Sequence, residues 1–111
     1  MTKLSETIPA GVVTGDNVRK LFDFAKANKF AYPAVNVIGT STINAALAAA
    51  RSANSPIIIQ LSSSGAQFFI GKGSLVCGIE GSVQGAIAAA KYARIVAKIY
   101  GIPVILNTDH A

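Results

Sequence analysis

The sequence predicts an α/β protein built on a parallel sheet. Helical and extended patterns alternate along the chain, which favours right-handed β-α-β crossovers. Ile57, Ile58 and Ile59 form a continuous β-branched run between turn residues. Such a run is typical of a strand that is buried on both faces of a parallel sheet.

Each element is predicted from hydrophobic spacing and from the turn residues that bound it. The expected helices cover residues 14–28, 40–54 and 82–100, and the expected strands cover residues 34–37, 57–59 and 103–106. Thr14 or Asp16, Thr40 or Ser41, and Ser82 are the expected N-caps. The expected buried faces are Val18, Leu21, Phe22 and Ala25; Ile43, Ala46, Leu47 and Ala50; and Tyr92, Ile95, Val96, Ile99 and Tyr100. Residues 62–81 are rich in Ser and Gly and are expected to form a loop.

Three strands alternating with helices leave two architectures open, a doubly wound open sheet and a (β/α)8 barrel. A closed barrel typically takes about 250 residues, whereas this chain has 111. No helix follows the last predicted strand to cover it. We therefore expect residues 1–111 to form the N-terminal part of one larger domain, without a linker or internal repeat.

Composition excludes several classes of protein. The chain is 51% hydrophobic and 14% charged, which excludes intrinsic disorder. A single cysteine excludes an internal disulfide framework. Neither a secretory signal nor an apolar run of about 18 residues is present, so we expect a cytoplasmic protein with no membrane partner. The net charge of +5 comes from scattered basic residues without interleaved aromatics, so we expect no nucleic-acid partner. A small anionic substrate fits this charge equally well.

Polar side chains stand at the ends of all three predicted strands. Asn36 ends the first strand, Gln60 and then residues 62–64 end the second, and Asn107, Thr108, Asp109 and His110 end the third. Parallel sheets flanked by helices place their active sites at the carboxyl ends of the strands. Taken singly, Asn36 could cap a turn and Ser62 could belong to an ordinary loop.

Asp109 and His110 are the sharpest chemical signal, since this is the only histidine in the chain. Imidazole can ligate a divalent metal, and a neighbouring carboxylate can transfer a proton. The alternative is a helix cap by Asp109 beside a surface histidine. Residues 71–73, Gly-Lys-Gly, could approach a phosphate or a cation, or form an ordinary turn.

Five segments together resemble the class II, zinc-dependent fructose-bisphosphate aldolases. They are residues 11–16, 30–36, 60–66, 71–73 and 100–110, the last ending in Thr-Asp-His. The resemblance implies a (β/α)8 TIM barrel, of which this chain supplies roughly the first three strands and their helices. It also implies reversible cleavage of fructose 1,6-bisphosphate to dihydroxyacetone phosphate and glyceraldehyde 3-phosphate, in glycolysis and gluconeogenesis.

The same resemblance implies a role for particular residues. His110 matches a zinc ligand, and Asp109 matches the carboxylic acid that transfers the proton of the C4 hydroxyl. Ser62 and Asn36 match substrate-binding residues. Residues 71–73 match a segment near the phosphate and a possible monovalent cation.

The sequence departs from the family pattern in two ways. Asn107 stands where the family usually has a histidine, and the family's other zinc histidines would lie beyond residue 111. A zinc site needs three or four ligands, so we expect the isolated chain to be inactive. The complete enzyme is expected to be a homodimer. The alternatives are an aldolase for another ketose bisphosphate, such as tagatose bisphosphate, and a non-catalytic α/β fragment that binds a partner or phosphate.

Overall fold

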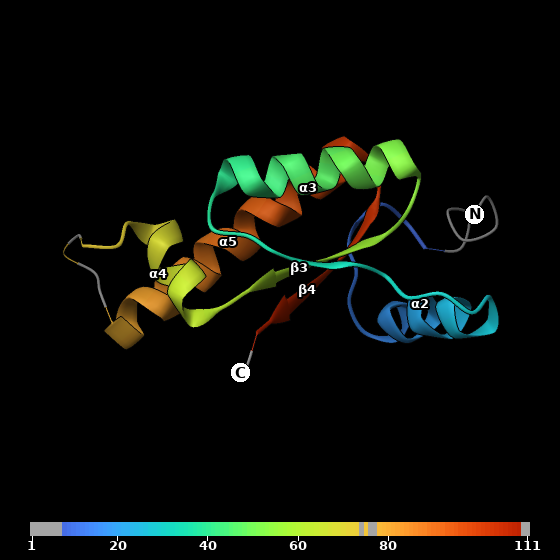
Figure 1. The fold of residues 1–111 in the computed structure, drawn as a ribbon, viewed down its shortest axis with the longest axis horizontal. Helices are drawn as coiled ribbons and strands as arrows, with labels where there is room; N and C mark the ends of the chain where they lie inside the picture. Colours follow the sequence, from blue (N-terminus) through green and yellow to red (C-terminus); the bar gives the residue numbers. More distant parts are fainter. Residues whose placement is uncertain (1–7, 74, 76–77, 110–111) are drawn as a thin grey trace.

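The computed structural model describes residues 8–73, 75 and 78–109. The elements, in chain order, are β1 (Gly11–Val12), α2 (Asp16–Ala27), β2 (Ala34–Asn36), α3 (Thr40–Ala53), β3 (Ile57–Leu61), α4 (Ser63–Ile70), α5 (Gly78–Tyr100) and β4 (Pro103–Thr108). The strands form one sheet in the order β1-β4-β3-β2, and every neighbouring pair is parallel (Figure 1). The predicted parallel α/β fold is confirmed.

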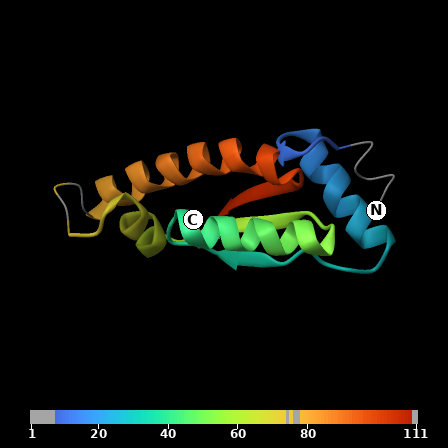
Figure 2. The same ribbon diagram turned by 90° about the horizontal axis from the view of Figure 1, so that it is seen from above.

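Helices cover the two faces of the sheet unequally (Figures 1 and 2). On one face, α3 and α5 pack against each other and against β3 and β4. This larger core includes Ile43, Leu47, Ala50, Ile57, Ile59, Val96, Ala97 and Val104. On the other face, Leu21 and Ala25 of α2 pack against Ile105, towards the amino ends of the strands. The carboxyl half of that second face is left without a covering helix from the described part of the chain.

The prediction of three strands is wrong, because β1 adds a fourth. It has only two residues, too few to leave a hydrophobic pattern. The Gly11 N–H donates to the Ile102 carbonyl at 3.0 Å, and the Val13 N–H donates to the Val104 carbonyl at 2.8 Å. β1 therefore exists because the start of β4 is beside it, which is a long-range contact.

The prediction of a loop over residues 62–81 is also wrong. Most of it is helical, since α4 occupies Ser63–Ile70 and α5 begins at Gly78. Serine and glycine are weak helix formers, so the local pattern favours a loop. A methyl group at Gly85 would overlap with the backbone of Ala66 in α4, so the two helices approach at backbone distance. This packing stabilises α4 where propensity does not.

The buried face of α5 differs from the predicted one. Its buried residues are mainly small: Gly81, Gly85, Ala89, Ala93, Val96 and Ala97. Ile95 and Ile99 are 63% and 72% exposed. On α2, Phe22 is likewise exposed, whereas all four predicted residues of α3 are buried. A helix that packs closely against its neighbours needs small side chains on the buried face. The spacing of large hydrophobic residues therefore does not predict which face of α5 is buried.

The helix caps also differ from those predicted. Gly15 and Gly39 occupy the N-cap positions of α2 and α3. The Thr42 hydroxyl accepts the Gly39 N–H at 3.0 Å, which completes the start of α3. Ser82 lies inside α5 rather than at its start. No helix among the described residues is long and apolar enough to cross a membrane.

Candidate functional site

The carboxyl ends of three strands lie at one level of the sheet. The parallel register pairs Asn36 of β2 with Gln60 of β3, and Gln60 with Asn107 of β4. Side chains alternate between the faces of a strand, so Gln60 and Asn107 share the face of Ile58 and Ile105. This is the face whose carboxyl half no described helix covers, and Asn36 and Asn107 are exposed there.

A ladder of hydrogen bonds joins these side chains. Asn107 Nδ2 donates to Gln60 Oε1 at 2.8 Å. Gln60 Nε2 donates to Asn36 Oδ1 at 3.1 Å. Asn36 Nδ2 donates to Asp109 Oδ2 at 3.3 Å. The ladder therefore leaves β4 at Asn107, crosses β3 and β2, and returns to Asp109 just beyond the end of β4.

Backbone pairing fixes the position of Asp109. Its N–H donates to the Leu61 carbonyl at 2.9 Å, which continues the β3–β4 pairing by one step. Because Asp109 is two residues beyond Asn107, its side chain returns to the same face of the sheet. The half-buried carboxylate thus lies at the edge where active sites form in parallel α/β folds.

The structure brings three of the predicted site residues, Asn36, Ser62 and Asp109, to the same edge of the sheet. Asn36 and Asp109, from different strand ends, are in direct contact. Ser62 lines a cavity with Asp109, and its hydroxyl accepts the Gly65 N–H at 3.0 Å and caps α4. Its substrate-binding role remains a prediction.

Two serines, Ser63 of α4 and Ser82 of α5, tie the two helices together. The hydroxyls of Ser63 and Ser82 are 2.6 Å apart, and Gln67 Nε2 donates to the Ser82 hydroxyl at 3.1 Å. This cluster holds the first turn of α4 beside the carboxyl end of β3. The position of Ser62 therefore depends on how closely α4 and α5 pack.

A metal would need more ligands than these residues supply. Within the described ranges, no group of three His, Cys, Asp or Glu residues is close enough to hold an ion. His110, the predicted zinc ligand, lies outside the described residues. A zinc site needs three or four ligands, so Asp109 and its amide neighbours do not form one by themselves.

The glycine-rich segment at residues 71–73 follows α4. Gly71 is the C-cap of that helix in the left-handed region, with φ 109°, a conformation that favours glycine. Lys72 is exposed. Part of this segment thus serves to end α4, and its predicted proximity to a phosphate or cation remains a prediction.

Gln60 and Asn107 belong to the site, although no catalytic or binding role was predicted for either. Both are polar residues at strand ends, which is visible in the sequence. Their mutual contact depends on the register, which aligns them with Asn36. The useful signal would have been an amide at the same step of three adjacent parallel strands.

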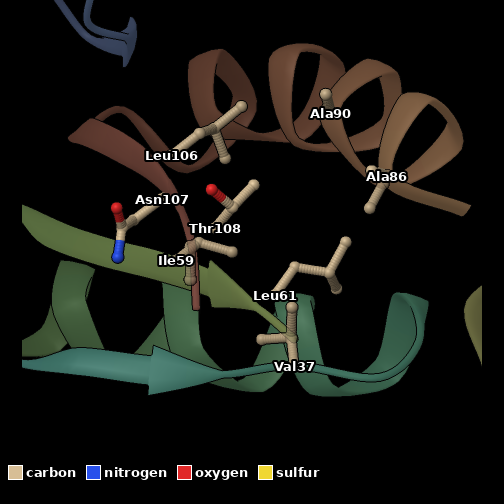
Figure 3. Close-up of a pocket in the computed structure, with 9 residues that line it drawn as sticks. Val37, Ile59, Leu61, Ala86, Ala90, Leu106, Asn107 and Thr108 are labelled. Atoms are coloured by element: carbon tan, nitrogen blue, oxygen red, sulfur yellow. The ribbon is translucent and has the colours of Figure 1, made fainter. Parts of the chain in front are cut away.

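A separate cavity of about 240 Å³ lies on the opposite, helix-covered face (Figure 3). Leu106 and Thr108 point towards α5, and the Asn107 amide points away from it. The lining is Val37, Ile59, Leu61, Ala86, Ala89, Ala90, Leu106, Asn107 and Thr108. No ionisable side chain lines this cavity. Asp109 instead lines a neighbouring cavity of about 250 Å³, together with Ser62 and Ser82.

A parallel sheet with an ionisable group at the carboxyl ends of its strands defines an α/β protein of the barrel or doubly wound type. Comparison with known proteins decides between them. The family model for class-II fructose-bisphosphate aldolase matches residues 16–111. The chain belongs to this family.

Individual relatives agree with the family model. Fructose-bisphosphate aldolase from Campylobacter jejuni serotype O:2 is 54% identical over 106 residues, which are 96% of this chain and 29% of the relative. The Kluyveromyces lactis aldolase is 55% identical over 104 residues, 94% of this chain and 29% of the relative. The crystal structure of a Campylobacter jejuni fructose-bisphosphate aldolase superposes with a TM-score of 0.89 at 52% identity, over 96% of this chain and 30% of that one. The chain therefore has the fold of part of an aldolase barrel and spans about 29% of the length of these relatives.

Proposed function

We propose that this chain forms part of a single (β/α)8 barrel domain that cleaves fructose 1,6-bisphosphate reversibly to dihydroxyacetone phosphate and glyceraldehyde 3-phosphate. The observation that carries the proposal is the contact between Asn36 and Asp109 at the carboxyl edge of the sheet. A proton-transfer group in an aldolase must stand at this edge, and family membership supplies the reaction.

In this proposal Asp109 moves the proton of the C4 hydroxyl. Cleavage of the C3–C4 bond needs the C4 hydroxyl proton removed, and the reverse reaction needs it returned. A positioned carboxylate can do both. Asn36 holds one oxygen of that carboxylate, and Asn36 and Ser62 line the substrate site.

The complete enzyme is proposed to use Zn²⁺, with His110 as one ligand and the others from outside this chain. A bound Zn²⁺ supplies Lewis-acid neutralisation of developing negative charge. The remaining proposals are a homodimer in the cytoplasm, in glycolysis and gluconeogenesis, with a phosphorylated sugar as substrate and a possible monovalent cation near residues 71–73.

The test is a chimera in which this chain replaces the matching segment of the Campylobacter jejuni aldolase. Dihydroxyacetone phosphate release from fructose 1,6-bisphosphate is measured, with tagatose 1,6-bisphosphate as the comparison substrate. We expect turnover of the fructose substrate within about tenfold of the parent aldolase, since over half of the aligned residues are identical. A folded chimera with no turnover would overturn the proposal, and a preference for the tagatose substrate would reassign the substrate.

A further inference from the structure

We propose that Asn107 is a positioning residue that orients the Asp109 carboxylate through Gln60 and Asn36. The inference rests on the proposed function, because it assigns Asp109 the proton transfer. It deepens that function by adding residues that need not touch the substrate. It also gives a purpose to the asparagine at position 107.

The geometry of the sheet makes such a ladder possible. Adjacent strands are about 4.8 Å apart, and residues in register on one face place their side chains side by side. Asn36, Gln60 and Asn107 are in register, and their amide groups meet at 2.8 Å and 3.1 Å. The backbone thus holds all three amides at one level, and only side-chain rotation remains to be ordered.

The charge of Asp109 sets the direction of every bond in the ladder. An ionised carboxylate only accepts hydrogen bonds, whereas a primary amide has one donor end and one acceptor end. Asn36 must therefore turn its Nδ2 to Asp109 and its Oδ1 to Gln60. Gln60 must then donate its Nε2 to Asn36 and accept at Oε1, which leaves Asn107 as the donor at the far end.

This direction makes Asn107 necessary for the orientation of the other groups. If its donor is lost, Gln60 can turn its Nε2 outward to solvent. The Asn36 oxygen would then lose its donor, and its amide could rotate away from Asp109. Proton transfer depends on the orientation of the carboxylate lone pairs. A change in the orientation of Asp109 therefore lowers kcat rather than the affinity for substrate.

The test uses neutral substitutions in the chimera. Asn107→Leu and Gln60→Met keep the approximate side-chain volume but remove the amide. We expect kcat to fall about tenfold in each, with KM for fructose 1,6-bisphosphate within about twofold, since the net contribution of one amide–amide hydrogen bond corresponds to about this factor. Asn107→His should retain kcat within about twofold, because imidazole Nδ1–H branches from the same carbon as the asparagine amide. Gln84→Met, at an exposed glutamine of α5 whose amide bonds Glu80, is the matched control and should leave kcat unchanged.

The double variant Asn107→Leu/Gln60→Met separates a ladder from independent effects. If the two groups act in one chain of hydrogen bonds, either substitution already breaks the chain, so kcat of the double variant should fall by no more than about tenfold. If the two effects were independent, the two decreases in kcat would multiply. Crystal structures of the single variants should show the Asp109 carboxylate rotated relative to the parent, with the strands unmoved.

Four results would be decisive. Single variants that keep kcat within about twofold, multiplicative losses in the double variant, or an unrotated carboxylate would each overturn the positioning role. A chimera without aldolase activity, in whose variant structures the carboxylate still rotates, would overturn the proposed function and leave the positioning role standing.

Discussion

Asn36 Nδ2 and Asp109 Oδ2 are 3.3 Å apart, although 73 residues separate them in the chain. The contact exists because β2 and β4 both pair in parallel with β3, one on each side. The helices between these strands form the crossovers that return the chain to the same edge of the sheet. The site therefore depends on the parallel pairing of β2 and β4 with β3 at this edge of the sheet.

Replacement of Asp109 by alanine in the chimera should lower kcat by roughly 10² to 10⁴-fold, as for other general acid–base groups. Zinc content, measured by atomic absorption, should stay at the parent level because His110 is intact. Turnover within about twofold of the parent would show that Asp109 only ends the strand.

Removal of zinc from the chimera should abolish turnover, and added Zn²⁺ should restore it. Lewis-acid assistance stabilises the charge that forms when the carbon–carbon bond breaks. The measurement is kcat after dialysis against a chelator and after re-addition of metal. Full activity in metal-free protein would contradict a zinc-dependent mechanism.

The substitution Gly85→Ala should destabilise the protein, by about 1–3 kcal/mol. An alanine within a helix normally stabilises it relative to glycine. Here the added methyl group would overlap with the backbone of Ala66, so α4 must move away from α5. Urea unfolding of the chimera measures the change, and Gln84→Ala on the same helix should change stability by less than about 0.5 kcal/mol. An increase in stability for Gly85→Ala would mean that α4 does not pack as described.

Tyr32 should make stability fall at alkaline pH. Its hydroxyl donates to the Leu21 carbonyl at 2.8 Å, and burial raises the pKa of this phenol. The folded state therefore holds the phenol proton more tightly than the unfolded state. The contribution of Tyr32 to the free energy of unfolding is fully present below about pH 10, and it is lost as the pH rises through the pKa of the folded state. Tyr32→Phe should cost about 1 kcal/mol near neutral pH. The difference in unfolding free energy between the two proteins should shrink above pH of about 10, and a constant difference would contradict this assignment.

The 111-residue chain expressed alone should associate and show no aldolase activity. Ile79, Ile95 and Ile99 of α5 are 86%, 63% and 72% exposed, and β2 pairs with β3 alone in the described sheet. A groove of about 690 Å³ beside β2, lined largely by alanines of α3, is also open. Exposed apolar surface and an open strand edge both promote association. Size-exclusion chromatography and near-UV circular dichroism provide the measurement, and a monomer with cooperative unfolding would contradict the prediction.

Local sequence patterns are sufficient to predict the parallel α/β class and the candidate proton-transfer group. The run from Ile57 to Ile59 and the apolar spacing of α3 are local signals. The spacing of apolar residues within one helix or strand is enough to predict which of its faces are buried. Asp109 was identifiable because it follows a buried strand. These features do not depend on which other segment lies beside them.

Which residues contact one another depends on how distant segments of the chain pack together. β1 forms because β4 lies beside it, and α4 forms against α5 through Gly85, although local propensity favours a loop there. The same holds for the ladder. The sequence shows Gln60 and Asn107 only as polar residues at strand ends, and the register of the strands places them beside Asn36. Register and close helix packing depend on contacts between segments far apart in the chain, which no local pattern encodes.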